Sequence, residues 1–238
     1  PPSQAGRLPL ALSVYHAMRA AGCPPTVVTY HTLIDLHGKG GDWEAAGRVL
    51  GAMAAARVPP VARTFNTLML AYNAAGAPLR AVAAAHRRML ACGLAPNATT
   101  FNALISAYGR AGALDRVLAL HADMVAAGCE RSQITFSSLM SAAERAGQWR
   151  LALSLFEEMR GEAGCPPSTI CFNAFLTACA AGGEWARAAE AVAAMPAAGC
   201  RPDVVTHTAL LSAYERGGRW RDALGVRLRG AVIIIDEA

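Results

Sequence analysis

Cysteine and histidine are the residues of this chain with the most readily recognised chemistry, because both bind zinc and both take part in catalysis. The 238 residues include seven cysteines and six histidines. No Cys-x-x-Cys pair occurs, and no pair of histidines has the spacing of a zinc site. The histidines also lack the partner pattern of general acid–base catalysis. The sequence therefore predicts no catalytic residue, no metal site and no cofactor.

Four of the cysteines each follow a glycine in similar surroundings, which indicates one position of an internal repeat. They are Cys23, Cys129, Cys165 and Cys200. Equivalent positions of stacked repeats lie about one repeat apart, so we expect no disulfide between these cysteines. We expect them to be buried and to act as small apolar side chains, in a reducing compartment.

The internal repeat extends over nearly the whole chain. An aromatic residue or a histidine lies three residues before a pair of large apolar residues, at intervals of 35 or 36 residues. These positions are Tyr30, Phe65, Phe101, Phe136, Phe172 and His207. A glycine follows eleven residues after each, then a Trp or Leu, and in the first five repeats a Met ten residues further on. Such a period predicts a stack of similar structural units.

Each repeat is predicted to form two helices. Phe101, Leu104 and Tyr108 recur at the spacing of one helical face, and Gly112 is well placed to end that helix. Apolar residues from 114 to 124 then mark a second helix. One helical pair cannot bury its apolar face alone. The sequence therefore predicts an all-α fold, a right-handed α-solenoid of helix-turn-helix repeats.

The repeat register divides the chain into seven segments. Residues 1–26 are expected to hold the second helix of a partial repeat, and residues 204–238 a degenerate last repeat whose apolar run at 232–235 would permit one short strand. Complete repeats are expected at 27–61, 62–97, 98–132, 133–168 and 169–203. The chain has no initiator Met, no signal peptide and no apolar run long enough to cross a bilayer. We interpret it as an internal or processed piece of a larger soluble protein.

The chain is basic, with a net charge of +5, and Lys39 is its single lysine. Arginine binds phosphate through two parallel hydrogen bonds, so a nucleic-acid partner is one interpretation. Codon bias in a GC-rich gene is the other, because the chain is also rich in Ala, Gly and Pro. Composition alone leaves both open.

The repeated segments resemble the pentatricopeptide repeat. VVTYHTLIDLHGKGGDWEAAGRVLGAM at 27–53 and ITFSSLMSAAERAGQWRLALSLFEEM at 134–159 carry the resemblance most clearly. A tetratricopeptide repeat would place its Trp in the first helix, whereas here Trp opens the second helix. The resemblance implies a P-type organellar protein from a GC-rich plant or algal nuclear genome. It also implies binding of single-stranded RNA, with one base per repeat.

In that family the fifth and last residues of each repeat read the base, and the second residue sandwiches it. Counted from Val27, the base-reading residues are then His31, Val61, Asn66, Asn97, Asn102, Ser132, Ser137, Ser168, Asn173, Asp203 and Thr208. The base-sandwiching residues are Val28, Arg63, Thr99, Ile134, Ile170 and Val205. From repeat 62–97 onward, the implied base order from 5′ to 3′ is pyrimidine, cytosine, purine, uracil and purine. His31 with Val61 has no assigned base.

Structural explanations compete with these assignments. Asn97, Ser132, Ser168 and Asp203 are also good helix N-caps, and capping alone would explain them. Asn66, Asn102 and Asn173 are harder to explain structurally, because Asn is a poor helix former and its amide suits the edge of a base. The tryptophans are expected to be core residues and not base-stacking platforms. They are Trp43, Trp149, Trp185 and Trp220.

Three functions follow as alternatives. The first is an RNA-binding adaptor for an organellar transcript, acting in its stability, processing or translation. The second is a structural subunit of an organellar ribosome or transcription complex that binds rRNA or protein. The pairs His31–Val61 and Ser137–Ser168 would read a base ambiguously. This weakens sequence-specific binding and favours the structural subunit. The third is the targeting array of an enzyme whose catalytic domain is absent here. We expect no enzymatic activity, no membrane association and no small-molecule substrate, in the matrix of mitochondria or the stroma of chloroplasts.

Overall fold

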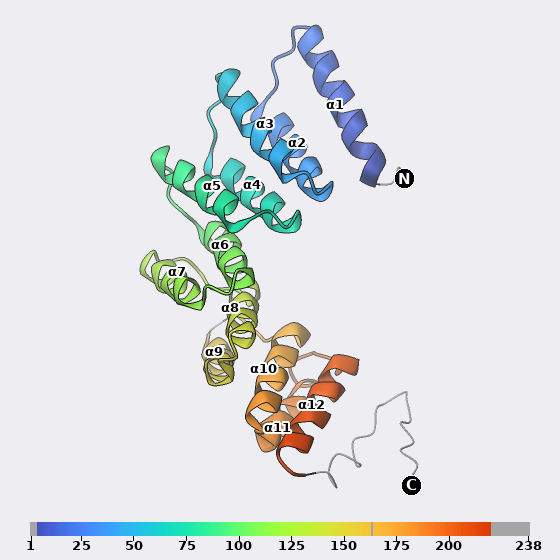
Figure 1. The fold of residues 1–238 in the computed structure, drawn as a ribbon, viewed down its shortest axis with the longest axis vertical. Helices are drawn as coiled ribbons and strands as arrows, with labels where there is room; N and C mark the ends of the chain where they lie inside the picture. Colours follow the sequence, from blue (N-terminus) through green and yellow to red (C-terminus); the bar gives the residue numbers. More distant parts are fainter. Residues whose placement is uncertain (1–3, 163, 220–238) are drawn as a thin grey trace. The chain divides into compact units, whose positions relative to one another are not determined.

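The computed structural model describes residues 4–162 and 164–219 (Figure 1). Within these residues it contains twelve α-helices and no β-strand, which confirms the predicted all-α fold. The helices are α1 (Gln4–Ala20), α2 (Val27–Lys39), α3 (Trp43–Ala55), α4 (Ala62–Ala74), α5 (Leu79–Ala91), α6 (Ala98–Arg110), α7 (Leu114–Ala126), α8 (Gln133–Arg145), α9 (Trp149–Gly161), α10 (Thr169–Gly182), α11 (Trp185–Ala194) and α12 (Val204–Arg216). The apolar run at 232–235 and Trp220 lie outside the described residues.

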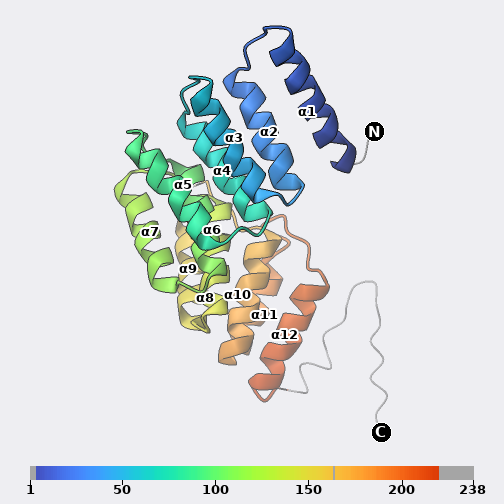
Figure 2. The same ribbon diagram turned by 45° about the horizontal axis from the view of Figure 1, so that its top comes forward.

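The chain divides into two compact units, and each is described by itself. The N-terminal unit comprises residues 1–111 and 119–129, and the C-terminal unit comprises residues 112–118 and 130–238. In the N-terminal unit, α2 packs against α3 and α4, and α4 packs against α5 and α6 (Figure 2). In the C-terminal unit, α8 packs against α9 and α10, and α10 packs against α11 and α12.

Each even-numbered helix is therefore the first helix of a repeat. The helices α2, α4, α8 and α10 each contact the second helix of their own repeat, and within a unit each first helix contacts the first helix of the next repeat. This is the helical-repeat solenoid that the period predicted. Its right-handed sense stays a prediction. The even-numbered helices begin at residues 27, 62, 98, 133, 169 and 204, so the second, third and fifth residues of every repeat lie in their first two turns.

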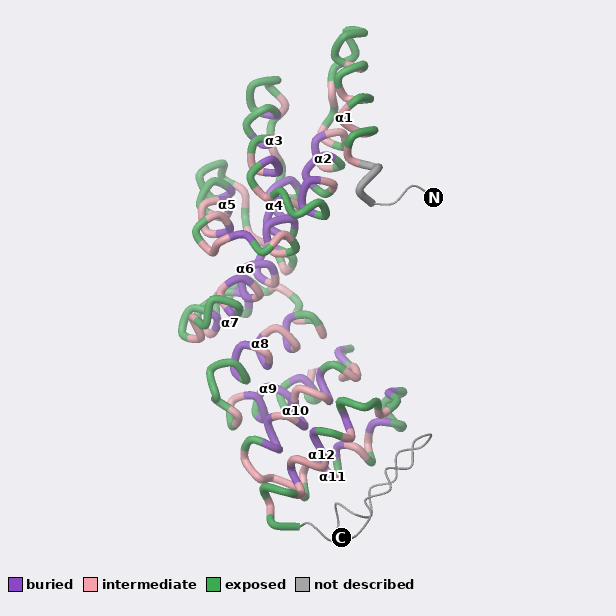
Figure 3. Tube along the Cα trace, turned by 45° about the vertical axis from the view of Figure 1, so that its right-hand side comes forward, coloured by how far each residue is buried: buried purple, intermediate pink, exposed green. Residues whose placement is uncertain are grey.

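The core of each repeat consists of the apolar residues that recur with the period. The methionines in the second helices, or directly after one in the case of α11, are fully buried: Met53, Met89, Met124, Met159 and Met195. Phe101 and Leu104 of α6 are buried as predicted, whereas Tyr108 on the same face is half-buried. Buried stretches recur along α2, α4, α6 and α10 (Figure 3). Burying one such side chain stabilises the fold by about 1.5–3 kcal/mol, so the repeated residues account for much of the stacking energy.

Two glycines show why this residue is needed at particular places. Gly112, just after α6, has a φ of 73°, which is the left-handed conformation predicted for it. Gly38 lies inside α2, where a Cβ would stand 2.7 Å from the Cα of Ala71 in α4. Only glycine lets the first helices of these two repeats approach so closely.

The prediction that the tryptophans are core residues is wrong for those described. Trp43, Trp149 and Trp185 are half-buried. Each is the first residue of a second helix, and its ring lies against the next repeat. A Cβ at Gly182 would lie 2.8 Å from the ring of Trp149, and a Cβ at Gly217 would lie 2.4 Å from that of Trp185. These tryptophans pack across the junction between repeats.

The prediction that the repeated cysteines are buried holds for only two of the four. Cys165 and Cys200 are buried, Cys129 is half-buried and Cys23 is exposed. The sulfur of Cys200 lies 3.3 Å from the carbonyl oxygen of Pro167, so the turn of the preceding repeat covers it. Cys23 belongs to the first turn of the described residues, where no equivalent turn precedes it. Burial at this position therefore depends on a neighbouring repeat.

Candidate nucleic-acid interface

The second residue of each repeat is exposed at the start of a first helix. The aliphatic residues at this position are Val28, Ile134, Ile170 and Val205, whose exposed fractions are 70, 64, 67 and 56%. Arg63 and Thr99 are exposed as well. Apolar surface costs about 25 cal/mol per Å² to leave in water, so exposed aliphatic side chains that recur with the period are suited to covering the flat face of a nucleobase.

The fifth residue of repeat 62–97 is held by the last residue of its own repeat and by the third residue of the next repeat. Asn66 donates from Nδ2 to Oδ1 of Asn97 at 3.0 Å. Its Oδ1 accepts a hydrogen bond from Oγ1 of Thr100 at 2.7 Å. The side chain of Asn66 is only 6% exposed, which fixes its amide in one place. The structure thus brings the predicted pair of fifth and last residues into direct contact.

The same arrangement recurs in the C-terminal unit. Asn173 donates from Nδ2 to Oδ1 of Asp203 at 3.2 Å, and Oγ1 of Thr206 donates to Oδ1 of Asn173 at 2.6 Å. Each asparagine amide has two N–H groups and two carbonyl lone pairs. These contacts use at least one N–H group and one lone pair of each amide, and Nδ2 of Asn173 also lies 3.3 Å from Oδ2 of Asp203.

Asp203 and Asn97 are helix caps as well as partners of the asparagines. Oδ1 of Asp203 accepts from the backbone N–H of Thr206 at 2.9 Å, and Oδ1 of Asn97 accepts from that of Thr100 at 3.1 Å. The backbone hydrogen bond from Thr206 lowers the pKa of Asp203, and the hydrogen bonds from Thr206 Oγ1 and Asn173 lower it further. Asp203 is therefore ionised at neutral pH. The capping explanation is correct for both residues, and it coexists with the contact to the fifth residue.

His31 and Val61 form a different pair. Nε2 of His31 lies 2.9 Å from Oγ1 of Thr64, which occupies the same repeat position as Thr100. Burial lowers the pKa of His31, and the nearby Arg63 lowers it further, so the imidazole is neutral at neutral pH. Val61 is 41% exposed and offers no hydrogen bond from its side chain.

An open groove of about 440 Å³ lies beside His31. Val28 and Arg63, the second residues of two successive repeats, both line it together with His31. The groove thus brings a polar fifth residue together with two predicted sandwiching positions. That is the arrangement needed to hold a planar ring by its faces and to reach its edge.

Comparison with known proteins decides which family these repeats represent. Residues 3–121 match the family described as the pentacotripeptide-repeat region of PRORP. Residues 119–183 and 172–219 match the pentatricopeptide repeat domain. The chain belongs to the pentatricopeptide repeat family. No curated protein matches it.

Solved pentatricopeptide repeat structures share the fold. The maize protein PPR10 is 27% identical, with a TM-score of 0.53 over 91% of this chain and 36% of its own. A structure of PPR10 in complex with an 18-nt psaJ RNA element is 22% identical, with a TM-score of 0.69 over 92% of this chain and 32% of its own. Nuclear proteinaceous RNase P 2 (PRORP2) from A. thaliana is 17% identical, with a TM-score of 0.57 over 68% and 36%. The chain spans about a third of the length of these proteins.

The remaining predicted base-reading positions of this pentatricopeptide repeat protein are less uniform. Ser137 donates its hydroxyl to the carbonyl of Ile134 in its own helix at 3.1 Å, and Ser168 donates to the sulfur of Cys171 at 3.4 Å. Asn102 is half-buried in the N-terminal unit, and Ser132 is exposed in the C-terminal unit. Repeat 133–168 therefore lacks the amide that repeats 62–97 and 169–203 present.

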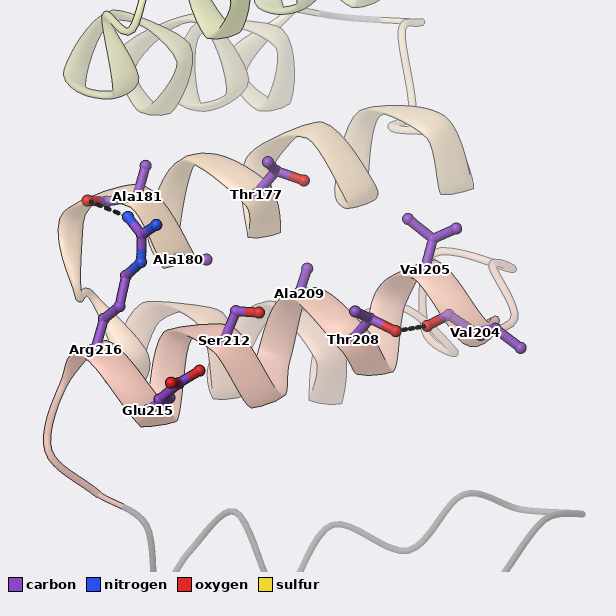
Figure 4. Close-up of a pocket in the computed structure, with 10 residues that line it drawn as sticks. All are labelled: Thr177, Ala180, Ala181, Val204, Val205, Thr208, Ala209, Ser212, Glu215 and Arg216. Carbon is purple, nitrogen blue, oxygen red and sulfur yellow. Dashed lines mark hydrogen bonds between the residues drawn. The ribbon is translucent and has the colours of Figure 1, made fainter. Parts of the chain in front are cut away.

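The last predicted reader, Thr208, lines a groove of about 590 Å³ between α10 and α12 (Figure 4). Its hydroxyl donates to the carbonyl of Val204 at 2.8 Å, and Val205 stands on the same wall. At the far end, Nη1 of Arg216 lies 3.5 Å from the carbonyl oxygen of Ala181. The groove thus combines aliphatic and hydroxyl side chains with the carboxylate of Glu215 and the guanidinium of Arg216 at one end.

Two sets of repeated polar residues were not predicted from the sequence. A basic residue occupies the thirteenth position of four repeats, in the last turn of the first helix: Lys39, Arg110, Arg145 and Arg216. A threonine that is 0% exposed occupies the third position of four repeats: Thr64, Thr100, Thr135 and Thr206. The repeat register contained both signals, since each set recurs at one fixed distance from the first residue of its repeat.

In the part of the chain that the structure describes, no group of His, Cys, Asp and Glu side chains is arranged to hold a metal ion. No helix in that part is long and apolar enough to cross a membrane.

Proposed function

We propose that this chain binds single-stranded RNA with one base facing each repeat, and that it does so without catalysing a reaction. The observation that carries the proposal is the fixed asparagine amide, which recurs in both units beside an exposed second residue. Asn66 and Asn173 have equivalent partners although they lie in different repeats. The solved complex of PPR10 with an RNA element supports the same choice of ligand.

Three features of the repeat would each recognise a different part of a nucleotide. The second residues, which are aliphatic in four of the repeats, cover the two faces of the base and remove it from water. The amide of the fifth residue donates to and accepts from the edge of the base, where sequence differences lie. The arginines at the thirteenth position add positive charge for the phosphates, whereas Lys39 is paired with Asp35 at 2.6 Å. Affinity would come from the second and thirteenth residues of the repeat, and base preference would come from the amide of the fifth residue.

The proposed base order follows the pairs of readers. From repeat 62–97 onward it is pyrimidine, cytosine, purine, uracil and purine, read from 5′ to 3′. The pair Asn173–Asp203 carries the assignment to uracil. An ionised carboxylate holds one N–H of Asn173, so the amide keeps a single orientation.

We place this activity in organellar RNA metabolism, in the stability, processing or translation of a transcript. Family membership supports a location in mitochondria or chloroplasts. Sedimentation of the native protein tests the role. Migration free of ribosomes fits an adaptor, and co-migration with ribosomal subunits after nuclease treatment would point to a structural subunit.

Fluorescence anisotropy with labelled RNA tests binding. We expect an RNA with the proposed base order to bind more tightly than one with the same bases in reversed order. Affinity for both should fall as salt is raised, since phosphate contacts release counterions. Equal affinity for the two RNAs would overturn sequence-selective binding, and affinity independent of salt would overturn phosphate contact.

Paired valine variants test the sandwiching positions. Val205→Ala should weaken RNA binding because it removes apolar surface from one face of a base. Val125→Ala is the matched control. Val125 is 50% exposed, close to the 56% of Val205, but it lies in a second helix. Equal loss of affinity in both variants would argue against a specific role for the second residue.

A further inference from the structure

The buried threonine at the third position of a repeat has a hydroxyl with two defined tasks. Oγ1 of Thr206 accepts from the backbone N–H of Asp203 at 3.1 Å. It also donates to Oδ1 of Asn173 at 2.6 Å. Thr100 does the same in its repeat, at 3.2 Å from the N–H of Asn97 and 2.7 Å from Oδ1 of Asn66. One hydroxyl thus joins the cap of its own helix to the fifth residue of the preceding repeat.

The single hydrogen of this hydroxyl has two acceptors within reach. Oγ1 of Thr206 lies 2.6 Å from Oδ1 of Asn173 and 2.9 Å from Oδ1 of Asp203. Oγ1 of Thr100 lies 2.7 Å from Oδ1 of Asn66 and 3.1 Å from Oδ1 of Asn97. In both repeats the shorter distance is to the asparagine amide, so the threonine supports the amide oxygen while the last residue of the preceding repeat holds the amide nitrogen.

We propose that the third residue of a repeat is a positioning residue for the base reader of the repeat before it. This inference rests on the proposed function. A fixed amide presents its donor and acceptor in one order, and that order distinguishes uracil from cytosine. An amide held only at its nitrogen can swing about its last torsion angle, and it would then discriminate less well between bases.

Repeat 133–168 shows where the arrangement is lost. The residue at the third position of the next repeat is Cys171, which is 0% exposed and stands where the other repeats have threonine. A thiol is a weak donor, and Ser168 donates to it at 3.4 Å. Cys171 cannot hold an amide as a threonine hydroxyl does. Installing a reader in this repeat should therefore require a change at Cys171 as well.

Removal of one hydroxyl tests the proposal at an existing reader. Thr206→Val should lower the ratio of affinities for RNA with uracil and with cytosine opposite repeat 169–203 by about tenfold. Preferences at the other bases should not change. The variant Thr206→Ser keeps a hydroxyl, so its ratio should equal that of the unmodified chain. Thr29→Val is the matched control. Thr29 accepts from the backbone N–H of Thr26 at 3.3 Å, but the helix before it, α1, is a second helix without a reader.

Construction of a new reader tests the proposal without destabilising an old one. Ser137→Asn with Ser168→Asp creates the reading pair, and a second protein adds Cys171→Thr. We expect the triple variant to prefer uracil opposite repeat 133–168 and the double variant to show little preference. Equal preference in both proteins, or full selectivity in Thr206→Val, would overturn this inference alone. Absence of base preference in the unmodified chain would overturn the proposed function first, and this inference with it.

Discussion

The amide nitrogen of Asn173 lies 3.2 Å from the carboxylate of Asp203, although the two residues are thirty positions apart in the chain. The contact arises because the cap of α12 stands beside the second turn of α10, where Asn173 projects. The last residue of one repeat is thus a structural part of the next helix and a partner of the fifth residue before it. This double role explains why capping and base reading cannot be separated by inspection of the sequence.

The first prediction separates these two roles of Asp203. Asp203→Asn should move the preferred base opposite repeat 169–203 from uracil toward cytosine, at a cost of about 1–3 kcal/mol against the original base. Thermal stability should change little, because Asn and Asp are equally good caps. Asn97 already makes the equivalent contacts, to Asn66 at 3.0 Å and to the N–H of Thr100 at 3.1 Å. Selection from randomised RNA would show the change at one position.

Asp42→Asn is the control for this experiment. Asp42 caps α3 and accepts from the backbone N–H of Ala45 at 2.8 Å, but α3 is a second helix. Its substitution should leave base preference unchanged. If Asp203→Asn lowers the melting temperature and keeps the preference for uracil, the residue acts only as a cap.

The second prediction concerns the close approach of two repeats at Gly38. Gly38→Ala should destabilise the N-terminal unit, because the new Cβ would meet the Cα of Ala71 at 2.7 Å. The cost of overpacking, about 1–3 kcal/mol, exceeds the gain of about 1 kcal/mol that alanine brings to a helix. Gly51→Ala in α3 is the opposite case, since no atom lies within 4 Å of the new Cβ. This variant should stabilise the N-terminal unit, because alanine favours the helix. Urea denaturation of both variants checks the pair. A stabilised Gly38→Ala would show that α2 and α4 are farther apart than described.

The third prediction is a pH dependence of stability from His31. Burial, with a smaller effect of Arg63, lowers the pKa of His31 below its ordinary value of 6.5. The unfolded chain therefore binds this proton more readily than the folded chain. The contribution of His31 to stability is complete above pH 6.5 and is lost as the pH falls from there toward the lowered pKa.

His31→Asn tests this dependence, because asparagine is neutral and occupies the same position in other repeats. Between about pH 7.5 and pH 5, the variant should lose less stability in urea than the unmodified chain. His37 and His86 also have pKa values lowered by burial, so part of the loss should persist in the variant. An NMR titration that places the pKa of His31 at or above 6.5 would contradict the prediction.

The fourth prediction concerns the reactivity of the thiols. Burial raises the pKa of the Cys179 thiol to about 12, so this group should stay protonated and unreactive near pH 8. Cys23 and Cys92 are exposed and should be alkylated quickly by iodoacetamide. Mass spectrometry of peptides after a short reaction measures each site, and the same reaction in urea should modify Cys179. Modification of native Cys179 as fast as Cys92 would show that this part of α10 opens readily.

The sequence by itself determined the helical pairs and the face of each helix that is buried. Recurrent apolar positions at helical spacing and a glycine after each first helix are visible within a single repeat. Which residues share a face follows from the geometry of one helix, and the period of 35 or 36 residues predicts that a neighbouring repeat covers that face. The burial of Met89 and Leu104 and the left-handed Gly112 could therefore be predicted.

The tertiary structure decided everything that depends on the next repeat. Cys200 is buried and Cys23 is exposed although both follow Gly at the same repeat position. Trp149 is half-buried at the junction where its ring packs against Gly182 of the next repeat. The contact of Thr206 with Asn173 requires two helices to stack in one register, at 2.6 Å between the oxygen atoms. A repeat period gives the order of such residues along the chain. Their distances are set only when the side chains of adjacent repeats pack together.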